Sequence, residues 1–309
     1  LRTTGDSRSE KEISETFNWF YYMPAAEQNT NITIQITDED VSKSGITIEN
    51  IKFIDPAMGS GHILVYAYDV FMQIYESLGY SMADAAKLIV QKNIYGLDID
   101  TRAFQLTYFA IMMKLRKDDR RSLTRDIRPN VFDVPESSTI ETDVLATLID
   151  KTESKNKVQL RKDLDNLINA FKYGNEYGSL IDFDKTLDWN DLQLLTNPKL
   201  SQGQLTLETI DLPLYQKNLA ELIKVGMVLS QTYEVGVMNP PYMGSGKMDA
   251  ILGKYVKTKF PHSKSDLFAV FIERLGSMIA KYGYYALITQ HSWMFLSSFE
   301  QLRAILTKH

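Results

Sequence analysis

The tetrapeptide Asn239-Pro240-Pro241-Tyr242 follows a short apolar run and has the composition of a clamp for an exocyclic amine. An amine conjugated to a ring is a poor nucleophile because its lone pair is delocalised, and two hydrogen-bond acceptors can localise that pair. The side-chain oxygen of Asn239 and the backbone oxygen of Pro240 can each accept one N–H. Pro240 and Pro241 stiffen the loop, and Tyr242 offers a flat face for a planar base. The alternative interpretation is a turn that ends a strand and carries a buried tyrosine.

A second segment with chemical potential runs from Ile51 to Gly61, where a short apolar strand leads into a glycine-rich turn and a long apolar helix. Gly59 and Gly61 allow the backbone to approach a ligand closely and expose amide groups at a helix N-terminus. Further along, a second strand ends at Asp98, whose carboxylate suits both hydroxyls of a ribose. The separation of Gly61 from Asp98 exceeds the roughly 20 residues of an NAD fingerprint, and a third glycine is absent, so a nicotinamide cofactor is disfavoured.

Three motifs, in this order, resemble those of the class I S-adenosylmethionine-dependent N6-adenine DNA methyltransferases. They are Asp55-Pro56-Ala57-Met58-Gly59-Ser60-Gly61, Gly96-Leu97-Asp98-Ile99-Asp100 and Asn239-Pro240-Pro241-Tyr242. Further segments resemble the PglX family, the methyltransferases of BREX-type phage-defence systems: Gly61-His62-Ile63-Leu64, Gly178-Ser179-Leu180-Ile181, Asn239-Pro240-Pro241-Tyr242-Met243-Gly244, Lys264-Ser265-Asp266-Leu267-Phe268 and His291-Ser292-Trp293-Met294-Phe295-Leu296. The resemblance extends from about Glu10 to the last residue.

This resemblance implies an enzyme that transfers a methyl group from S-adenosylmethionine to N6 of adenine at specific DNA sites, as the host-marking component of a phage-defence or restriction-modification system. It implies cofactor contacts at Asp55, Pro56, Ala57, Gly59, Gly61, Asp98 and Asp133. Asp55 would lie near the methionine end of the cofactor and Asp98 at its ribose. Asn130 and Asp133 are the two candidates for a contact with the cofactor adenine. The implied catalytic residues are Asn239, Pro240, Pro241 and Tyr242, and the implied partner is double-stranded DNA with a flipped adenine.

Contacts with DNA must be local, because the net charge of the chain is −5. Five lysines follow the clamp and could neutralise phosphates beside a flipped nucleotide. They are Lys247, Lys254, Lys257, Lys259 and Lys264, interleaved with Tyr255 and Phe260. A second candidate is the arginine-rich segment from Arg116 to Arg128. For both clusters the alternative is a solvated charged surface.

The composition indicates a cytoplasmic protein without a bound metal. The sequence contains no cysteine, and its four histidines are scattered. No apolar run approaches the roughly 20 residues of a membrane span, and the N-terminus is too polar for a signal peptide. The chain begins at Leu1 and ends at His309 within a helical pattern, so we expect a piece of a larger protein.

The elements that must position these motifs alternate between strand and helix. Strands are predicted at 52–55, 93–97, 233–238 and 284–289, with a third strand near Asp133, and helices at 62–78, 82–91, 101–114, 265–281 and 299–308. Alternation of this kind predicts an α/β fold with a mainly parallel sheet and helices on both faces, which the resemblance specifies as Rossmann-like. Ligands of such sheets bind beyond the carboxyl ends of the strands, so Asp55, Asp98 and Asn239 are predicted to share one site.

Four regions follow from these patterns. Residues 1–50 form an irregular flank, 51–139 the cofactor-binding half, 140–232 a mostly helical insertion, and 233–309 a truncated catalytic half. The insertion is too long for a strand-to-helix connection and is predicted to be a surface appendage with loop-like segments around 174–200. Thr101 or Asp100 is predicted to cap the helix at 101–114, and for Asp100 this role is favoured over that of a second ribose ligand.

The sequence is also compatible with several other functions. The same clamp occurs in enzymes that methylate RNA adenine or a protein glutamine amide. A non-catalytic module could bind the cofactor or dock other phage-defence proteins. A restriction enzyme with an added nuclease is a further alternative, although the sequence holds no clear nuclease cluster. Gly244-Ser245-Gly246-Lys247 lacks the spacing of a P-loop, so an ATPase is excluded.

Overall fold

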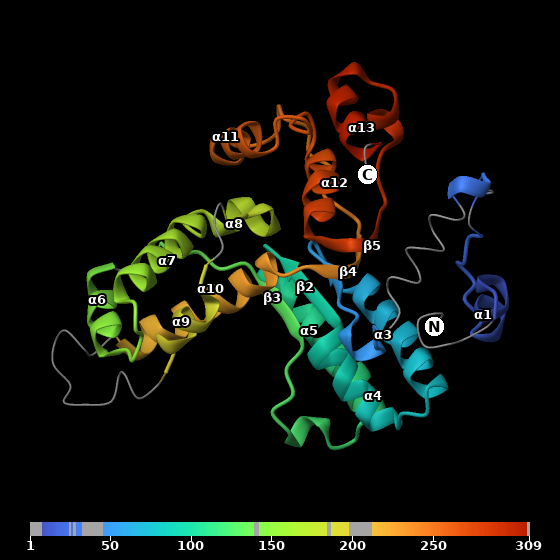
Figure 1. Ribbon diagram of the computed structural model, residues 1–309, viewed down its shortest axis with the longest axis horizontal. Helices are drawn as coiled ribbons and strands as arrows, with labels where there is room; N and C mark the ends of the chain where they lie inside the picture. Colours follow the sequence, from blue (N-terminus) through green and yellow to red (C-terminus); the bar gives the residue numbers. More distant parts are fainter. Residues whose placement is uncertain are drawn as a thin grey trace.

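The computed structural model describes residues 8–24, 26, 29–32, 46–138, 142–183, 187–197 and 212–307. Its centre is a five-stranded sheet in the order β3-β2-β1-β4-β5 (Figure 1). The strands are β1 (Phe53–Asp55), β2 (Ile94–Asp98), β3 (Asn130–Asp133), β4 (Tyr233–Met238) and β5 (Ile279–Leu287). Every neighbouring pair is parallel, which confirms the predicted α/β class.

Three helices of the first half share a core with one face of the sheet: α3 (His62–Ser77), α4 (Met82–Leu88) and α5 (Thr101–Asp118). Successive strand residues point to opposite faces, and Phe53, Ile94 and Val131 face these helices. Helix α3 begins after Gly61, which has a φ of 79°. A Cβ at Gly61 would lie 2.6 Å from Oγ1 of Thr107 in α5, so a glycine is needed for these helices to pack closely.

The other face is covered by elements of the insertion and of the second half. Helices α6 (Thr142–Lys151), α7 (Lys157–Ala170), α9 (Trp189–Leu194), α10 (Leu212–Ser230) and α12 (Leu267–Met278) belong to one core cluster with Ile54 and Leu97 of the sheet. In Figure 1 the insertion helices form a group beside the sheet. These helices pack mainly against one another, and the core that they share is continuous with that of the sheet. Their role as a surface appendage stays a prediction.

The predicted loop around 174–200 is wrong in part. It contains α8 (Gly174–Tyr177), the 3-10 turn η5 (Gly178–Leu180) and α9. Asp188 caps α9 by accepting N–H groups from Asn190 and Asp191. This cap and the buried Leu192 provide the local and tertiary stabilisation that a short helix needs.

The second half matches the predicted pattern apart from one shift and one helix, at 250–259, that was not predicted. Strand β4 has the predicted bounds, whereas α12 ends at Met278 and β5 begins at Ile279, earlier than the strand predicted from 284. Pairing of Tyr233 with Ile279 extends the ladder between β4 and β5 and replaces the last predicted helical turn. The remaining helices here are α11 (Ala250–Lys259), η7 (His291–Met294), η8 (Ser297–Phe299) and α13 (Glu300–Leu306).

The flank holds α1 (Glu10–Thr16) and η2 (Ile48–Asn50), and the first half holds two further short elements, a π turn (Ile89–Asn93) and η4 (Ser122–Thr124). Helix α1 lies in the flank predicted as irregular. Its capping box between Ser9 and Glu12 is a sequence signal that the prediction missed. Within the described part of the chain, no helix combines the length and the apolar character needed to cross a membrane.

Candidate active site

The three predicted site residues meet at the carboxyl edge of the sheet. Strands β2, β1 and β4 are neighbours; β1 ends at Asp55, β2 ends at Asp98, and Asn239 follows β4. A cavity of about 290 Å³ opens at this edge, near the lower limit of common ligand pockets. Its lining joins Pro56, Ala57 and Asp98 of the first half to Asn239 and Pro241 of the second. The other lining residues are Ile99, Glu176, Tyr177, Gly178, Ser179, Leu180, Leu252, Leu267 and Phe271.

Six of the predicted site residues do not line this cavity: Asp55, Gly59, Gly61, Asp133, Pro240 and Tyr242. The Gly59 amide donates to Oδ2 of Asp98 at 2.8 Å, and Gly61 serves the packing of α3 on α5. Oδ2 of Asp133 accepts a hydrogen bond from Thr101 at 2.9 Å. Gly59 thus helps to hold Asp98. Ligand contacts by these six residues, and by the five that line the cavity, stay predictions.

Two carboxyl groups stand close to the first-half side of the cavity. Oδ2 of Asp98 accepts from Gly59, and its Oδ1 accepts from the amide of Asp100 at 2.9 Å. Asp100 also caps α5, as predicted. Asp55 is only 1% exposed, and its pKa is raised to about 7, mainly by burial. The hydrogen bond from the Ala57 amide lowers this pKa, and the charge of Asp98 raises it.

Among the residues that the structure describes, no cation forms an ion pair with Asp55 or Asp98. Asp55 is buried and Asp98 is half-buried, and a buried carboxylate without a counter-ion is costly, so this side of the cavity favours a ligand that carries positive charge. A sulfonium compound with an ammonium group, such as S-adenosylmethionine, fits that requirement. Among the described residues, no group of three or more acidic or histidine side chains could hold a metal ion.

The wall segment, residues 178–181, brings the insertion into the cavity through Gly178, Ser179 and Leu180. Gly178 has a φ of 53°, and a Cβ there would lie 2.6 Å from Cγ2 of Ile99. The Ser179 hydroxyl donates to the backbone oxygen of Pro56 at 2.5 Å, which ties this segment to the turn after β1. The sequence showed these residues as a family-like motif, but nothing in their local pattern predicted that they face the cavity.

The clamp loop is held by residues to which the sequence gave no role. Oδ1 of Asp266, the cap of α12, accepts from the amides of Met243 and Phe268 at 3.1 and 3.3 Å. The Tyr242 hydroxyl contacts the backbone oxygen of Ile288 at 2.6 Å and Oδ1 of Asn239 at 3.3 Å. Because a hydroxyl has one proton, the shorter contact dominates and leaves the Asn239 oxygen largely open. Tyr242 is 46% exposed, so its ring is accessible beside the cavity.

The five predicted lysines do not all line one cavity. Lys254 and Lys257 line an open groove on α11, and Lys247 and Lys264 are exposed. Lys259 lines a separate cavity of about 350 Å³ together with Tyr177 and Tyr255. The aromatic residues between the lysines are not exposed platforms, because Phe260 is buried and Tyr255 stacks on Tyr177 with ring centroids 4.0 Å apart.

The arginine-rich segment lies at the other end of α5 from Asp100, away from the cavity. Two of its arginines pair within the segment, Arg125 with Asp119 at 3.1 Å and Arg128 with Asp126 at 2.9 Å. This segment therefore does not extend the surface around the clamp.

A parallel sheet in this order, with its cavity beyond the ends of β1, β2 and β4, defines a Rossmann-like methyltransferase fold. The family described as Eco57I restriction-modification methylase matches residues 92–309. The chain belongs to this family.

Three curated relatives are similar to this chain. An adenine-specific methyltransferase PglX from Lacticaseibacillus casei (strain Zhang) is 47% identical over 98% of the chain and 24% of its own length. An adenine-specific methyltransferase BrxX from Escherichia coli O9:H4 (strain HS) is 35% identical over 93% of the chain and 25% of its own length. The type II restriction enzyme and methyltransferase RM.Eco57I from Escherichia coli is 24% identical over 86% of the chain and 22% of its own length. The identities to PglX and BrxX, which extend over nearly the whole chain, confirm the predicted family resemblance. The chain spans about a quarter of the length of these three relatives.

Proposed function

We propose that the protein containing this chain is a DNA methyltransferase that uses S-adenosylmethionine to methylate N6 of adenine, as a component of a phage-defence or restriction-modification system. The observation that carries this proposal is the single cavity shared by Asp98 and Asn239. Because the two residues line the same cavity, a methyl donor held at Asp98 and an amine held at Asn239 would lie within one space. The names of the similar proteins, two of them adenine-specific methyltransferases, support the choice of adenine.

The cofactor would be held by the first-half side of the cavity. Asp98 offers remaining lone pairs to ribose hydroxyls, since each of its oxygens accepts one backbone amide and has capacity for another bond. Asp55 would complement an ammonium group, and Pro56, Ala57 and Ile99 provide apolar contact. S-adenosylmethionine would supply an electrophilic methyl group bonded to a sulfonium, and the sulfur departs as a neutral thioether when this bond breaks.

The second-half side would hold the adenine. The open oxygen of Asn239 and the backbone oxygen of Pro240 accept the two N–H groups of the amine, which directs its lone pair toward the methyl group. Tyr242 offers its exposed ring to the flipped base, a contact worth about 1–3 kcal/mol against an unstacking cost of a few kcal/mol. The proton released from the amine passes to water. The reaction would be accelerated by positioning the amine beside the methyl group and by polarising its N–H bonds, and this direct transfer requires no protein nucleophile.

The substrate class is tested by offering labelled S-adenosylmethionine to the whole protein with duplex DNA, RNA and total protein in parallel. We expect label in DNA, recovered as N6-methyladenine after digestion to nucleosides. DNA in which adenine is already methylated is the control and should take up no label. Label in RNA or in a glutamine side chain would establish one of the alternative substrates instead. Cofactor binding without transfer to any of the three would establish a non-catalytic module.

Lys254 and Lys257 are proposed to contact DNA phosphates from the groove on α11. Each phosphate contact contributes about 0.9 to the slope of log affinity against log salt. The double variant Lys254→Gln/Lys257→Gln should therefore lower the magnitude of that slope by about 2, measured by DNA binding at several salt concentrations. The control is Lys117→Gln/Arg120→Gln, which removes two exposed charges from the far end of α5. An equal change in both double variants would mean that the effect is non-specific.

A further inference from the structure

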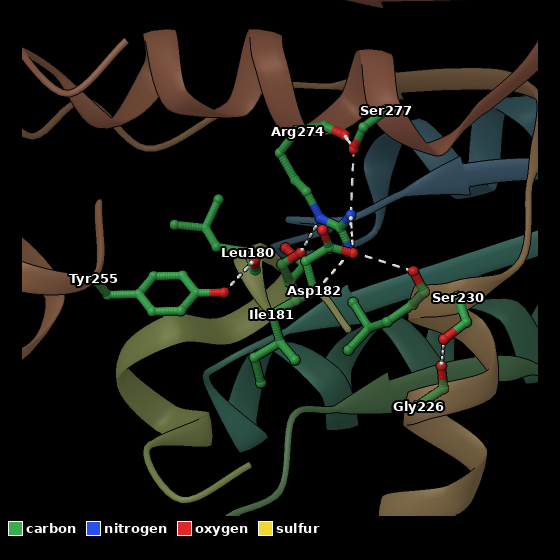
Figure 2. A network of polar contacts seen from close by, with 10 residues as sticks. Leu180, Ile181, Asp182, Gly226, Ser230, Tyr255, Arg274 and Ser277 are labelled. Carbon is green, nitrogen blue, oxygen red and sulfur yellow. Dashed lines mark hydrogen bonds and ion pairs between the residues drawn. The ribbon is translucent and has the colours of Figure 1, made fainter. Parts of the chain in front are cut away.

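The wall segment is fixed by side chains of the second half. Its three successive carbonyl groups each accept a hydrogen bond from α11 or α12 (Figure 2). Nε of Arg274 donates to Ser179 at 3.0 Å and its Nη2 donates to Ile181 at 2.7 Å. The hydroxyl of Tyr255 donates to Leu180 at 3.0 Å. A short 3-10 turn has little intrinsic stability, so its conformation depends on such tertiary contacts.

Arg274 is a charged residue in a place where an apolar side chain would ordinarily pack. It is 3% exposed, and burial lowers its pKa. Besides the wall segment, its guanidinium contacts Leu229 at 3.2 Å, Ser277 at 3.3 Å and Asp182 at 3.5 Å. Its five N–H groups thus have five acceptors, and three of these are backbone carbonyls. Such a saturated arrangement favours one conformation of the segments it joins.

Tyr255 supports the cavity in two ways. Its hydroxyl binds the wall segment, and its ring stacks on Tyr177 with an interplanar angle of 18°. Tyr177 itself lines the cavity. Burial raises the pKa of Tyr255 to about 12, so its hydroxyl keeps its proton at neutral pH and remains a donor.

We propose that Arg274 and Tyr255 are positioning residues that hold the wall segment against Ile99 and thereby set the shape of the cofactor cavity. This inference rests on the proposed function. Neither residue needs to touch the cofactor. Their effect passes through Gly178, which would lie too close to Ile99 if it carried a side chain, and through Ser179, which binds the turn at Pro56.

Two variants test this role. Tyr255→Phe removes the hydroxyl but keeps the ring on Tyr177, and Arg274→Lys keeps the charge but cannot span the carbonyls of Ser179, Ile181 and Leu229. Calorimetry should give a dissociation constant for S-adenosylmethionine raised about 3- to 10-fold in Tyr255→Phe and at least about tenfold in Arg274→Lys. At saturating cofactor, the turnover of both should stay within about threefold of the wild type, because the clamp is unchanged.

The matched control is Tyr233→Phe. Tyr233 is more deeply buried than Tyr255. Its hydroxyl donates to the backbone oxygen of Val228 at 2.7 Å and accepts from Gln231 at 2.7 Å, and neither partner belongs to the wall segment. This variant should lower the unfolding midpoint as Tyr255→Phe does and leave the dissociation constant unchanged. An equal loss of affinity in Tyr233→Phe, or unchanged affinity in Tyr255→Phe, would overturn the proposal.

Hydrogen exchange of the ligand-free protein separates this proposal from the proposed function. Amides of residues 178–182 should exchange at least about tenfold faster in Tyr255→Phe and Arg274→Lys than in the wild type or Tyr233→Phe. Unchanged exchange would refute the positioning role even if the wild type binds the cofactor. The wild type could also fail to bind the cofactor while exchange is faster in the two variants. This result would refute both the proposed function and the role in shaping a cofactor site, and the contacts of Arg274 and Tyr255 would then be structural only.

Discussion

Asn239→Ala is expected to lower the rate of methyl transfer to adenine by about 10²–10³-fold or more, while the affinity for S-adenosylmethionine stays within about twofold. The side-chain oxygen of Asn239 is the acceptor that the proposal assigns to one N–H of the amine, and alanine leaves that N–H unpaired in the cavity. Asn239 is exposed, so its replacement should change the free energy of unfolding by less than about 0.5 kcal/mol. Single-turnover kinetics on duplex DNA measures the rate, and calorimetry measures cofactor binding.

Two comparisons sharpen this experiment. Asn190→Ala removes an exposed asparagine from α9 and should leave both quantities unchanged. Tyr242→Phe retains the stacking face and loses the contact with Ile288, so it should lose less activity than Tyr242→Ala, which also loses the ring. A wild-type rate in Asn239→Ala would remove the clamp from the mechanism. A loss of cofactor affinity as large as the loss of rate would place Asn239 at the donor instead.

Asp55→Asn is expected to stabilise the ligand-free protein at pH 8 and to have little effect near pH 4. The folded pKa of Asp55, about 7, is higher than the ordinary value of 3.8, because burial disfavours the charged form. The native state therefore holds a proton that the unfolded state has released between these two pH values, and stability falls as the pH rises from about 4 to about 7. One pKa unit corresponds to about 1.4 kcal/mol, so the neutral amide should raise the free energy of unfolding by as much as about 4 kcal/mol at pH 8.

Urea unfolding at pH 5 and pH 8 measures this dependence, and the gain should be clearly smaller at pH 5. The same variant should bind S-adenosylmethionine at least about tenfold more weakly, because an amide does not complement an ammonium group. The control Asp165→Asn, an exposed carboxylate on α7, should change stability by less than about 0.5 kcal/mol at either pH. A stabilisation that is equal at both pH values would contradict the role of charge burial at Asp55.

The prediction from sequence was most accurate where structure depends on neighbouring residues. The bounds of β4, the start of α3 after Gly61 and the cap at Asp100 match the structure. Each follows from a local cause: apolar content, the freedom of glycine at positive φ, or a side chain that accepts an amide two residues further on. The predicted boundary between α12 and β5 was misplaced because it depends on pairing of β5 with β4, which the local sequence pattern does not encode.

The candidate site was predictable to the same extent. Asp55, Asp98 and Asn239 each follow a recognisable strand, and parallel strands bring their carboxyl ends to one edge. The sequence could not predict that Lys259 lines a different cavity from Lys254 and Lys257. The side of α11 that faces the insertion is set by the tertiary packing of this helix.

The amino-acid sequence by itself determined the strands, the glycine turn, the clamp and the family resemblance, since these reside in short segments. Only the tertiary structure decided what closes the cavity. The wall segment meets the turn at Pro56 through a hydrogen bond from Ser179 that spans 123 residues. It is held there by Arg274 and Tyr255 of the second half. No local pattern encodes that meeting, because it arises from the burial of the apolar faces of the insertion helices in the core of the sheet.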